Sequence, residues 1–170
     1  YDAGAEDYDA FLCGRDQPRD SSVDCERLEA DGLATDGSDL NLPTIATDDL
    51  VSEQVIRRRV TNVGEAAQFV ARVEMPTTID AEIVPPLLSL DAGESADFEI
   101  RLSADATTFD AWQFGALTWT SGATAVRSPL AIRALRFAAP VFVAGSGTEG
   151  SLDVALRSGY TGTYRATLSG

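Results

Sequence analysis

Carboxylates are the most abundant side chains in this sequence that could do chemistry. The chain has 27 Asp and Glu, 13 cationic residues that are all Arg, and no His. Without His there is no imidazole base and no Ser-His-Asp triad, and without Lys there is no Schiff base and no P-loop lysine. Two Cys and no His are also too few ligands for a structural zinc site. Only carboxylate chemistry therefore remains available.

Two groups of acids could in principle carry that chemistry. Asp48-Asp49 could contribute to a glycosidase pair, but most acids on strands face water. The run 36–39, near Glu29 and Asp31, could suggest calcium. It lacks the alternating ligands and the final Glu of an EF-hand loop, and Asp-Gly is an ordinary turn pair. We predict no catalytic residue, no metal and no cofactor.

The run 145–150 matches the pattern G-x-G-x-x-G. A dinucleotide fingerprint needs a helix after the last glycine, so that the helix N-terminus faces the pyrophosphate. The next residues, 151–156, alternate as a strand does. We interpret the run as a glycine-rich turn.

Cys13 and Cys25 are the only cysteines, and they flank a polar, charged segment. An even pair with no metal partner favours one disulfide, although two unrelated thiols are the alternative. Closing such a loop stabilises a chain by about 3 kcal/mol in the chain-entropy model. A disulfide would indicate an oxidising compartment and a secreted protein.

The net charge of −14 is concentrated early in the chain, where residues 1–41 hold 12 acids and three Arg. Such a surface repels phosphate, so we expect no nucleic-acid partner and no attraction to anionic membranes. A site for a cation or a basic partner is the alternative to a merely solvated surface. The longest apolar stretch, 137–145, is far shorter than the roughly 20 residues of a membrane span.

Arginines and aromatics supply the candidate contact residues. In the cluster 57–59, Arg58 must point to the opposite side of a strand from its two neighbours. The cluster could pair with acidic strands or dock an acidic partner domain. Trp112 follows a predicted turn and should be partly exposed, whereas Trp119 alternates as a core residue does. A sugar platform that includes Phe114 is an alternative to packing.

From residue 40 the hydrophobic period is two, which predicts strands. The expected strands are 42–47, 55–61, 69–75, 80–84, 96–102, 113–120 and 124–132, separated by turn signals such as Asn62-Val63-Gly64 and Pro85-Pro86. Seven short strands over about 90 residues, each with one wet face, are typical of an antiparallel β-sandwich. The predicted fold is all-β, with the sandwich at 40–133.

The two flanking regions differ from the sandwich. In the linker, 1–39, Tyr1, Tyr8, Phe11 and Leu12 could form the apolar stripe of a short helix around 6–12. Residues 15–39 have loop composition. Residues 134–170 predict three more strands, at 141–144, 152–156 and 164–168, which either pack on the sandwich or start a further domain. Both ends look cut from a longer polypeptide.

Five segments together resemble the C-terminal part of subtilisin-like serine proteases, most closely cucumisin-type subtilases and their bacterial relatives. They are residues 1–13 with a Cys after Phe-Leu, Leu-Asn-Leu-Pro-Thr-Ile-Ala at 40–46, Arg-Val-Thr-Asn-Val-Gly at 59–64, and the closing hairpin segments 114–119 and 126–132. Leu42 departs from the family, which usually has Tyr there. Residues 134–170 are less clearly covered.

The resemblance implies a fibronectin-III-like domain of a secreted serine endopeptidase, whose catalytic domain would lie upstream and be its partner. No catalytic motif of the family falls in this chain. The domain would pack on the protease and support it. We expect Tyr1, Tyr8, Phe11, Arg58 and Trp112 to be the interdomain contact residues. The alternative is a free-standing adhesion or glycan-binding sandwich of a surface protein.

Overall fold

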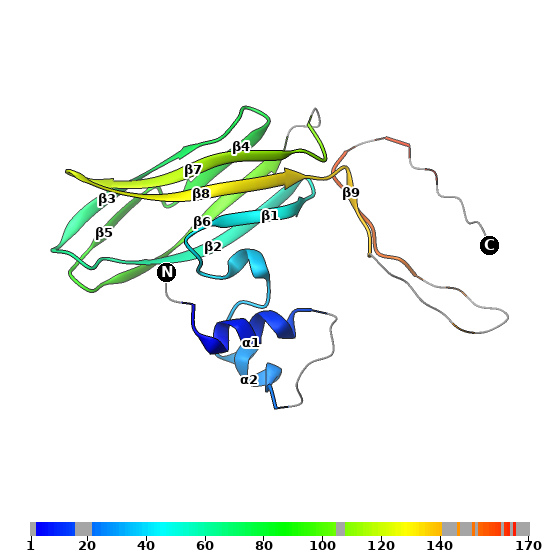
Figure 1. The fold of residues 1–170 in the computed structure, drawn as a ribbon, viewed down its shortest axis with the longest axis horizontal. Helices are drawn as coiled ribbons and strands as arrows, with labels where there is room; N and C mark the ends of the chain where they lie inside the picture. The colour runs from blue at the N-terminus through cyan, green and yellow to red at the C-terminus, as the bar shows by residue number, and fades with distance from the viewer. Residues whose placement is uncertain are drawn as a thin grey trace.

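The computed structural model describes residues 3–15, 22–104, 108–140, 146, 151, 153–160, 162, 163 and 165. Two β-sheets face each other in a sandwich, and two short helices lie to one side of it (Figure 1). The fibronectin-III-like β-sandwich predicted from the sequence is confirmed.

The larger sheet has five strands in the order β1-β8-β7-β3-β5. Their bounds are Ile45–Leu50 for β1, Thr124–Ala134 for β8, Trp112–Ser121 for β7, Ala67–Glu74 for β3 and Leu87–Leu90 for β5. All neighbours are antiparallel except β1 and β8, which run parallel from the pair Ile45 and Leu130. The prediction of a purely antiparallel sandwich was therefore wrong at this edge. Parallel neighbours need a long crossover, which the six strands between β1 and β8 supply.

The smaller sheet has three strands in the order β2-β6-β4, with bounds Glu53–Thr61, Ser95–Ala104 and Ile79–Val84. All seven predicted strands are present, with shifted ends. The short strand β5 was missed, because its four residues directly follow the Pro85-Pro86 pair and give little alternation to read.

The core lies between the inner faces of the two sheets, where the alternating apolar residues meet. Phe98 and Trp119, from opposite sheets, form an edge-to-face pair with ring centroids 5.2 Å apart. Trp119 is a core residue, as predicted. The buried cluster comprises Ile45, Leu50, Ile56, Ile79, Ile83, Leu88, Leu90, Phe98, Ile100, Leu102, Leu117, Trp119, Leu130, Ile132 and Ala134.

Asn62 connects the two turns at one end of the sandwich. Its side-chain amide donates hydrogen bonds to the backbone carbonyls of Glu65, Leu90 and Asp91, and its Oδ1 accepts one from the amide of Gly64. The side chain is buried. The Asn-Val-Gly motif therefore has a structural role, because one amide satisfies polar backbone groups of both turns.

The linker is more ordered than its composition predicts. Helix α1 (Ala5–Cys13) confirms the expected short helix. Helix α2 (Cys25–Ala30) and the 3₁₀ turn η1 (Gly37–Asp39) fall where we expected loop. Asp24 caps α2 with its carboxylate, and Gly32 at φ 78° ends it, with Leu33 N–H donating to Leu28 O. Such caps make a helix this short possible.

The C-terminal region differs from the three predicted strands. Residues 153–156 form no strand, and 141–144 and most of 164–168 lie outside the described residues. A two-residue pairing of β9 (Phe137–Ala138) with β10 (Arg157–Ser158) was not expected. Tyr160 packs against Phe109 with ring centroids 6.5 Å apart, and Arg157 forms a 2.7 Å ion pair with Asp49. Within this region, residues 157–160 therefore contact the sandwich, whereas residues 153–156 are exposed.

Candidate functional site

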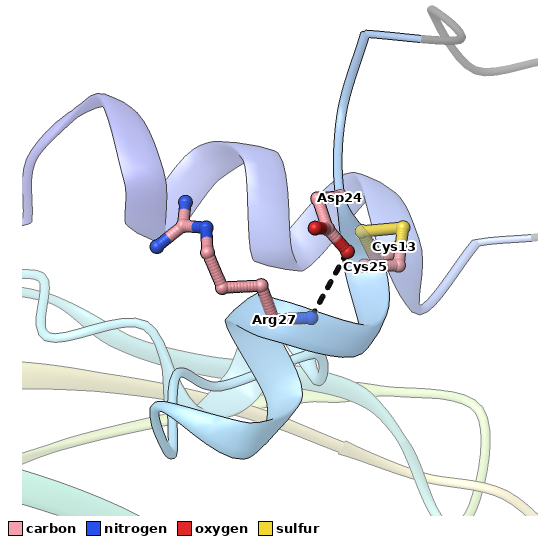
Figure 2. The surroundings of a disulfide bond; sticks show 4 residues. All are labelled: Cys13, Asp24, Cys25 and Arg27. Atoms are coloured by element: carbon pink, nitrogen blue, oxygen red, sulfur yellow. Dashed lines mark hydrogen bonds between the residues drawn. A yellow bond between two sulfur atoms is a disulfide. The ribbon is translucent and has the colours of Figure 1, made fainter.

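The disulfide joins Cys13 at the end of α1 to Cys25 at the start of α2, as predicted (Figure 2). The two Cα atoms are 5.6 Å apart and the residues are 12 positions apart in sequence. In the same view the Asp24 carboxylate accepts a 3.1 Å hydrogen bond from the amide of Arg27. The disulfide thus fixes the two helices to each other, and beside it the Asp24 cap satisfies an amide in the first turn of α2.

Phe11 faces this domain and not solvent alone. A Cβ built on Gly37 would lie 2.8 Å from the Phe11 ring, so the ring packs directly on the glycine of η1. The guanidinium of Arg15 lies 5.1 Å from the centroid of the same ring. Phe11 was predicted to contact another domain. In the structure its ring instead helps to attach α1 to the rest of the linker.

The linker also covers the free edge of β2. Oδ1 of Asp39 accepts a 2.7 Å hydrogen bond from the amide of Arg57, and Oδ1 of Asn41 accepts a 3.1 Å bond from the amide of Arg59. These two side chains satisfy alternate donors of an edge strand, which would otherwise be open to pairing. This role belongs to the fold of the domain itself.

Arg58 is buried, with only 6% of its surface exposed. It points inward like Ile56, and its Nη1 donates to the carbonyls of Ser38 and Arg57. Burial lowers the pKa of the Arg58 guanidinium, and the carboxylate of Asp39 acts in the opposite direction. The prediction that Arg58 offers a contact surface is therefore corrected: Arg57 and Arg59 face outward, whereas Arg58 faces inward and is bonded to the carbonyl of Ser38.

Those two neighbours pair with acids, which is the first alternative raised by the sequence. Arg59 forms a two-point ion pair with Asp97, with distances of 2.7 and 2.9 Å. Arg57 lies 3.7 Å from Asp39 and 4.0 Å from Glu99. The hydrogen bond from Arg59 lowers the pKa of Asp97, whereas burial, which is the largest cause, raises the pKa of Asp39.

Trp112 is 44% exposed and begins strand β7 on the outer face of the five-stranded sheet. Phe114, two residues later on the same face, is 68% exposed. The register places Arg133 opposite Trp112 and Ala131 opposite Phe114. Arg133 also lies over the Trp112 ring, 5.7 Å from its centroid, and 3.8 Å from the carboxylate of Asp48.

We call this surface the aromatic patch and define it as Trp112, Phe114 and the small apolar residues beside them on β1 and β8, namely Ala46, Pro129 and Ala131. The sequence predicts Trp112 as an interdomain contact residue and Phe114 only as part of an alternative sugar platform, and it does not point to Ala46, Pro129 or Ala131. Alternation along the strand would have placed Phe114 on the surface with Trp112, because both residues lie on the side of β7 opposite to the core residues Leu117 and Trp119. Two exposed aromatics on one face of a strand are typical of a contact surface.

The remaining predicted contact residues lie in the linker. Tyr8 is about half exposed on α1, and Leu12 is similarly exposed one turn later. Tyr1 lies outside the described residues. The end of α1, at Gly14 and Arg15, lines a polar cleft that Trp112 and Asp48 also line. The structure thus brings the end of the linker helix and the aromatic patch to the same region of the surface.

The acids singled out in the sequence serve the fold. Asp36 accepts a 2.8 Å hydrogen bond from the amide of Ser38, Asp39 bonds β2, and Asp49 pairs with Arg157. Within the described ranges, no three or more Asp, Glu or Cys side chains are grouped so that they could hold a metal ion. No helix in that part of the chain is long and apolar enough to cross a membrane.

Comparison with known proteins agrees with the architecture. The family model described as fibronectin type-III domain matches residues 39–132. A subtilisin-like protease of Glycine max is 34% identical over 138 residues, which are 78% of this chain and 18% of that protein. Subtilisin-like protease SBT2.6 of Arabidopsis thaliana is 32% identical over 69% of this chain and 15% of its own. The chain therefore spans less than a fifth of these two relatives.

One solved structure, the FixG-related protein from Vibrio parahaemolyticus, aligns with a TM-score of 0.42 and 12% identity over 48% of this chain and 78% of that chain. The family model, by contrast, covers more than half of the chain and includes strands β1 to β7 and most of β8. The resemblance read from the sequence motifs is confirmed: the chain belongs to the fibronectin type-III domain family, in the form that resembles the corresponding region of subtilisin-like proteases.

Proposed function

We propose that this chain is a non-catalytic accessory domain of a secreted subtilisin-type serine endopeptidase, and that it packs on and supports the catalytic domain. The observation that carries the proposal is the similarity of most of the chain to several subtilisin-like proteases of which it spans only 15–19%. The rest of such a protein would hold the Asp, His and Ser of the triad.

Two further features support this role. The chain has no His, so a subtilisin-type triad would have to come from elsewhere in the polypeptide. The disulfide Cys13–Cys25 fits an extracellular location, where such bonds persist. We propose secretion on this ground and on the similarity to the plant proteases.

The aromatic patch is the surface that we propose for the contact. Large aromatic side chains contribute most at well-packed interfaces, and Trp112 and Phe114 lie close together on one sheet face. Tyr8 and Leu12 of the linker are further candidates, because both are exposed on the first helix of the chain. Phe11 and Arg58 are not proposed, since each already packs within this domain.

The non-catalytic role is tested with a fluorophosphonate probe, which labels an activated serine. We expect the polypeptide in which this chain follows a catalytic domain to be labelled and to cleave casein. We expect the 170-residue chain alone to show neither reaction at any pH. Labelling of the isolated chain, or a parent polypeptide without a triad, would contradict the proposal and favour an adhesion or glycan-binding module.

A further inference from the structure

Half of the edge of β8 is unpaired in the described structure. Strand β1 begins at Ile45 and pairs with β8 only from Leu130 onward. Residues 124–128 pair with β7 on one side and with no described strand on the other. Thr124 to Arg127 are all exposed. An edge of this kind presents backbone donors and acceptors that another strand can use.

The register shows which groups point outward. A two-residue turn joins Ser121 to Thr124, so these two form a hydrogen-bonded pair, and the bonding then alternates along the strands. The amides of Ala125 and Arg127 consequently point away from β7. The next residue of this parity is Pro129, which has no amide to offer and lies just before the pairing with β1 begins. The free edge therefore has a defined length and a defined end.

An apolar groove runs beside this edge. Its volume is about 390 Å³, and Val60, Phe69, Leu88, Trp119 and Val126 supply its apolar lining. Val126 has the parity of the inner face and is nevertheless 57% exposed. The sandwich is thus open between β8 and β2 at this end, and a side chain of an added strand could enter there.

Arg127 lies at the centre of the free edge, on the outer face. The exposed arginines of the other long strands, and Arg133 of β8 itself, each lie within 4.0 Å of a carboxylate; they are Arg57, Arg59, Arg72, Arg101 and Arg133. Arg127 forms no ion pair with any described residue. Its exposed guanidinium would therefore favour a carboxylate directly opposite it on a strand added at this edge.

We propose that the free edge of β8 binds an extended peptide segment, which adds as a strand beside residues 124–128. Its backbone would bond the amides of Ala125 and Arg127. A carboxylate on the added strand would lie opposite Arg127, and the apolar side chains on either side of it would turn into the groove beside Val126. This site lies on a different part of the five-stranded sheet from the aromatic patch and does not depend on the proposed protease contact.

The experiment titrates the ¹⁵N-labelled 170-residue chain with a capped peptide of sequence Val-Thr-Val-Glu-Val-Thr-Val, monitored by NMR. A matched peptide carries Lys in place of Glu. Two variants accompany the wild type. Arg127→Glu reverses the charge, and Ala125→Pro removes one edge amide at the parity where Pro129 is already tolerated. Thermal melting of each variant checks that the sandwich is folded.

We expect saturable shifts at residues 124–128 and at the Trp119 indole with the Glu peptide, and about tenfold weaker binding of the Lys peptide. Arg127→Glu should reverse that preference, and Ala125→Pro should abolish binding to both. No saturable shift at millimolar peptide would overturn the proposal and leave Arg127 as a guard against edge pairing. Shifts confined to the aromatic patch, self-association of the chain through β8, or a preference that Arg127→Glu leaves unchanged would also overturn it.

Discussion

Asn62 holds together the two turns at one end of the sandwich. Its amide donates to three backbone carbonyls and its Oδ1 accepts from Gly64. Asn62→Asp keeps the size but removes the donors and sets a carboxylate against carbonyls. We expect a loss of about 2–3 kcal/mol in the free energy of unfolding, measured by urea denaturation.

The matched control is the neighbouring residue, Val63, which is 97% exposed. Val63→Ala should change the free energy of unfolding by less than about 0.5 kcal/mol. If the Asn62→Asp variant proves as stable as the Val63→Ala variant, the two turns must be held in another way.

Asp39 and Asp97 should titrate on opposite sides of the ordinary aspartate pKa. Burial raises the pKa of Asp39 above its unfolded value. Its contribution to the free energy of unfolding therefore becomes more favourable as pH falls through that raised pKa. The hydrogen bond from Arg59 lowers the pKa of Asp97, so its contribution is present above the unfolded pKa and is lost as pH falls through the lower folded one. NMR titration of the carboxyl carbons measures both pKa values; the reverse order would contradict the dominant effect of burial on Asp39 and the hydrogen bond from Arg59 to Asp97.

Gly115 allows strands β7 and β3 to approach each other closely. A Cβ at this position would lie 2.2 Å from the carbonyl oxygen of Glu74 and 2.2 Å from the sulfur of Met75. The backbone atom cannot move aside as a side chain can. We expect Gly115→Ala to cost about 1–3 kcal/mol through overpacking.

Gly64→Ala is the control for this prediction, because its added Cβ would meet only the Asn62 Oδ1, at an ordinary 3.5 Å. Chemical denaturation of both variants gives the comparison. Equal stability of the two would mean that the strands can separate locally at low cost.

The disulfide should stabilise the linker and leave the sandwich alone. Cys13→Ser with Cys25→Ser removes a closure worth about 3 kcal/mol in the chain-entropy model. Amide hydrogen exchange in α1 and α2 should then become faster, while the central amides of β6, which are bonded on both sides by β2 and β4, should not change. Faster exchange in β6 would show that the linker and the sandwich unfold together.

Elements with a long alternating pattern can be predicted from the sequence. Elements that form only because of caps, a disulfide or a distant strand partner cannot. The strand containing Phe98, Ile100 and Leu102 could be read directly from its period of two. Helix α2 could not, because its six residues depend on the caps at Asp24 and Gly32 and on the disulfide. The parallel pairing of β1 and β8 depends on a chain crossing that no local pattern contains.

The candidate surface was predictable only in part, for the same reason. Trp112 could be identified because a turn precedes it, and Phe114 could have been found from strand parity. Arg58 was wrongly predicted to be a contact residue. Strand alternation predicts on which side of a strand a residue lies, but it does not predict whether other residues bury that side. Arg58 is buried, and its guanidinium is bonded to the carbonyl of Ser38.

At the scale of the whole molecule, the outer face of the five-stranded sheet has two different halves. The half near β1 carries the aromatic patch, and the other half carries polar side chains together with one exposed apolar pair, Val70 and Leu87, which lie opposite each other on β3 and β5. If the domain supports a protease through the patch, substitutions in the two halves should change thermal stability by different amounts when the catalytic domain is present. The pair Val70 and Leu87 stabilises the sheet through its own cross-strand contact and needs no such partner.

The central claim is tested most directly by the thermal stability of the paired substitution Trp112→Ser with Phe114→Ser, in the polypeptide that carries the catalytic domain and in the 170-residue chain alone. Val70→Ser with Leu87→Ser is the matched control on the same sheet face. We expect the patch pair to destabilise the longer polypeptide by about 2 kcal/mol or more while changing the isolated chain much less, and the control pair to affect both forms equally. Equal losses in the two forms for the patch pair would contradict the account, because Trp112 and Phe114 would then stabilise only the sandwich to which they belong.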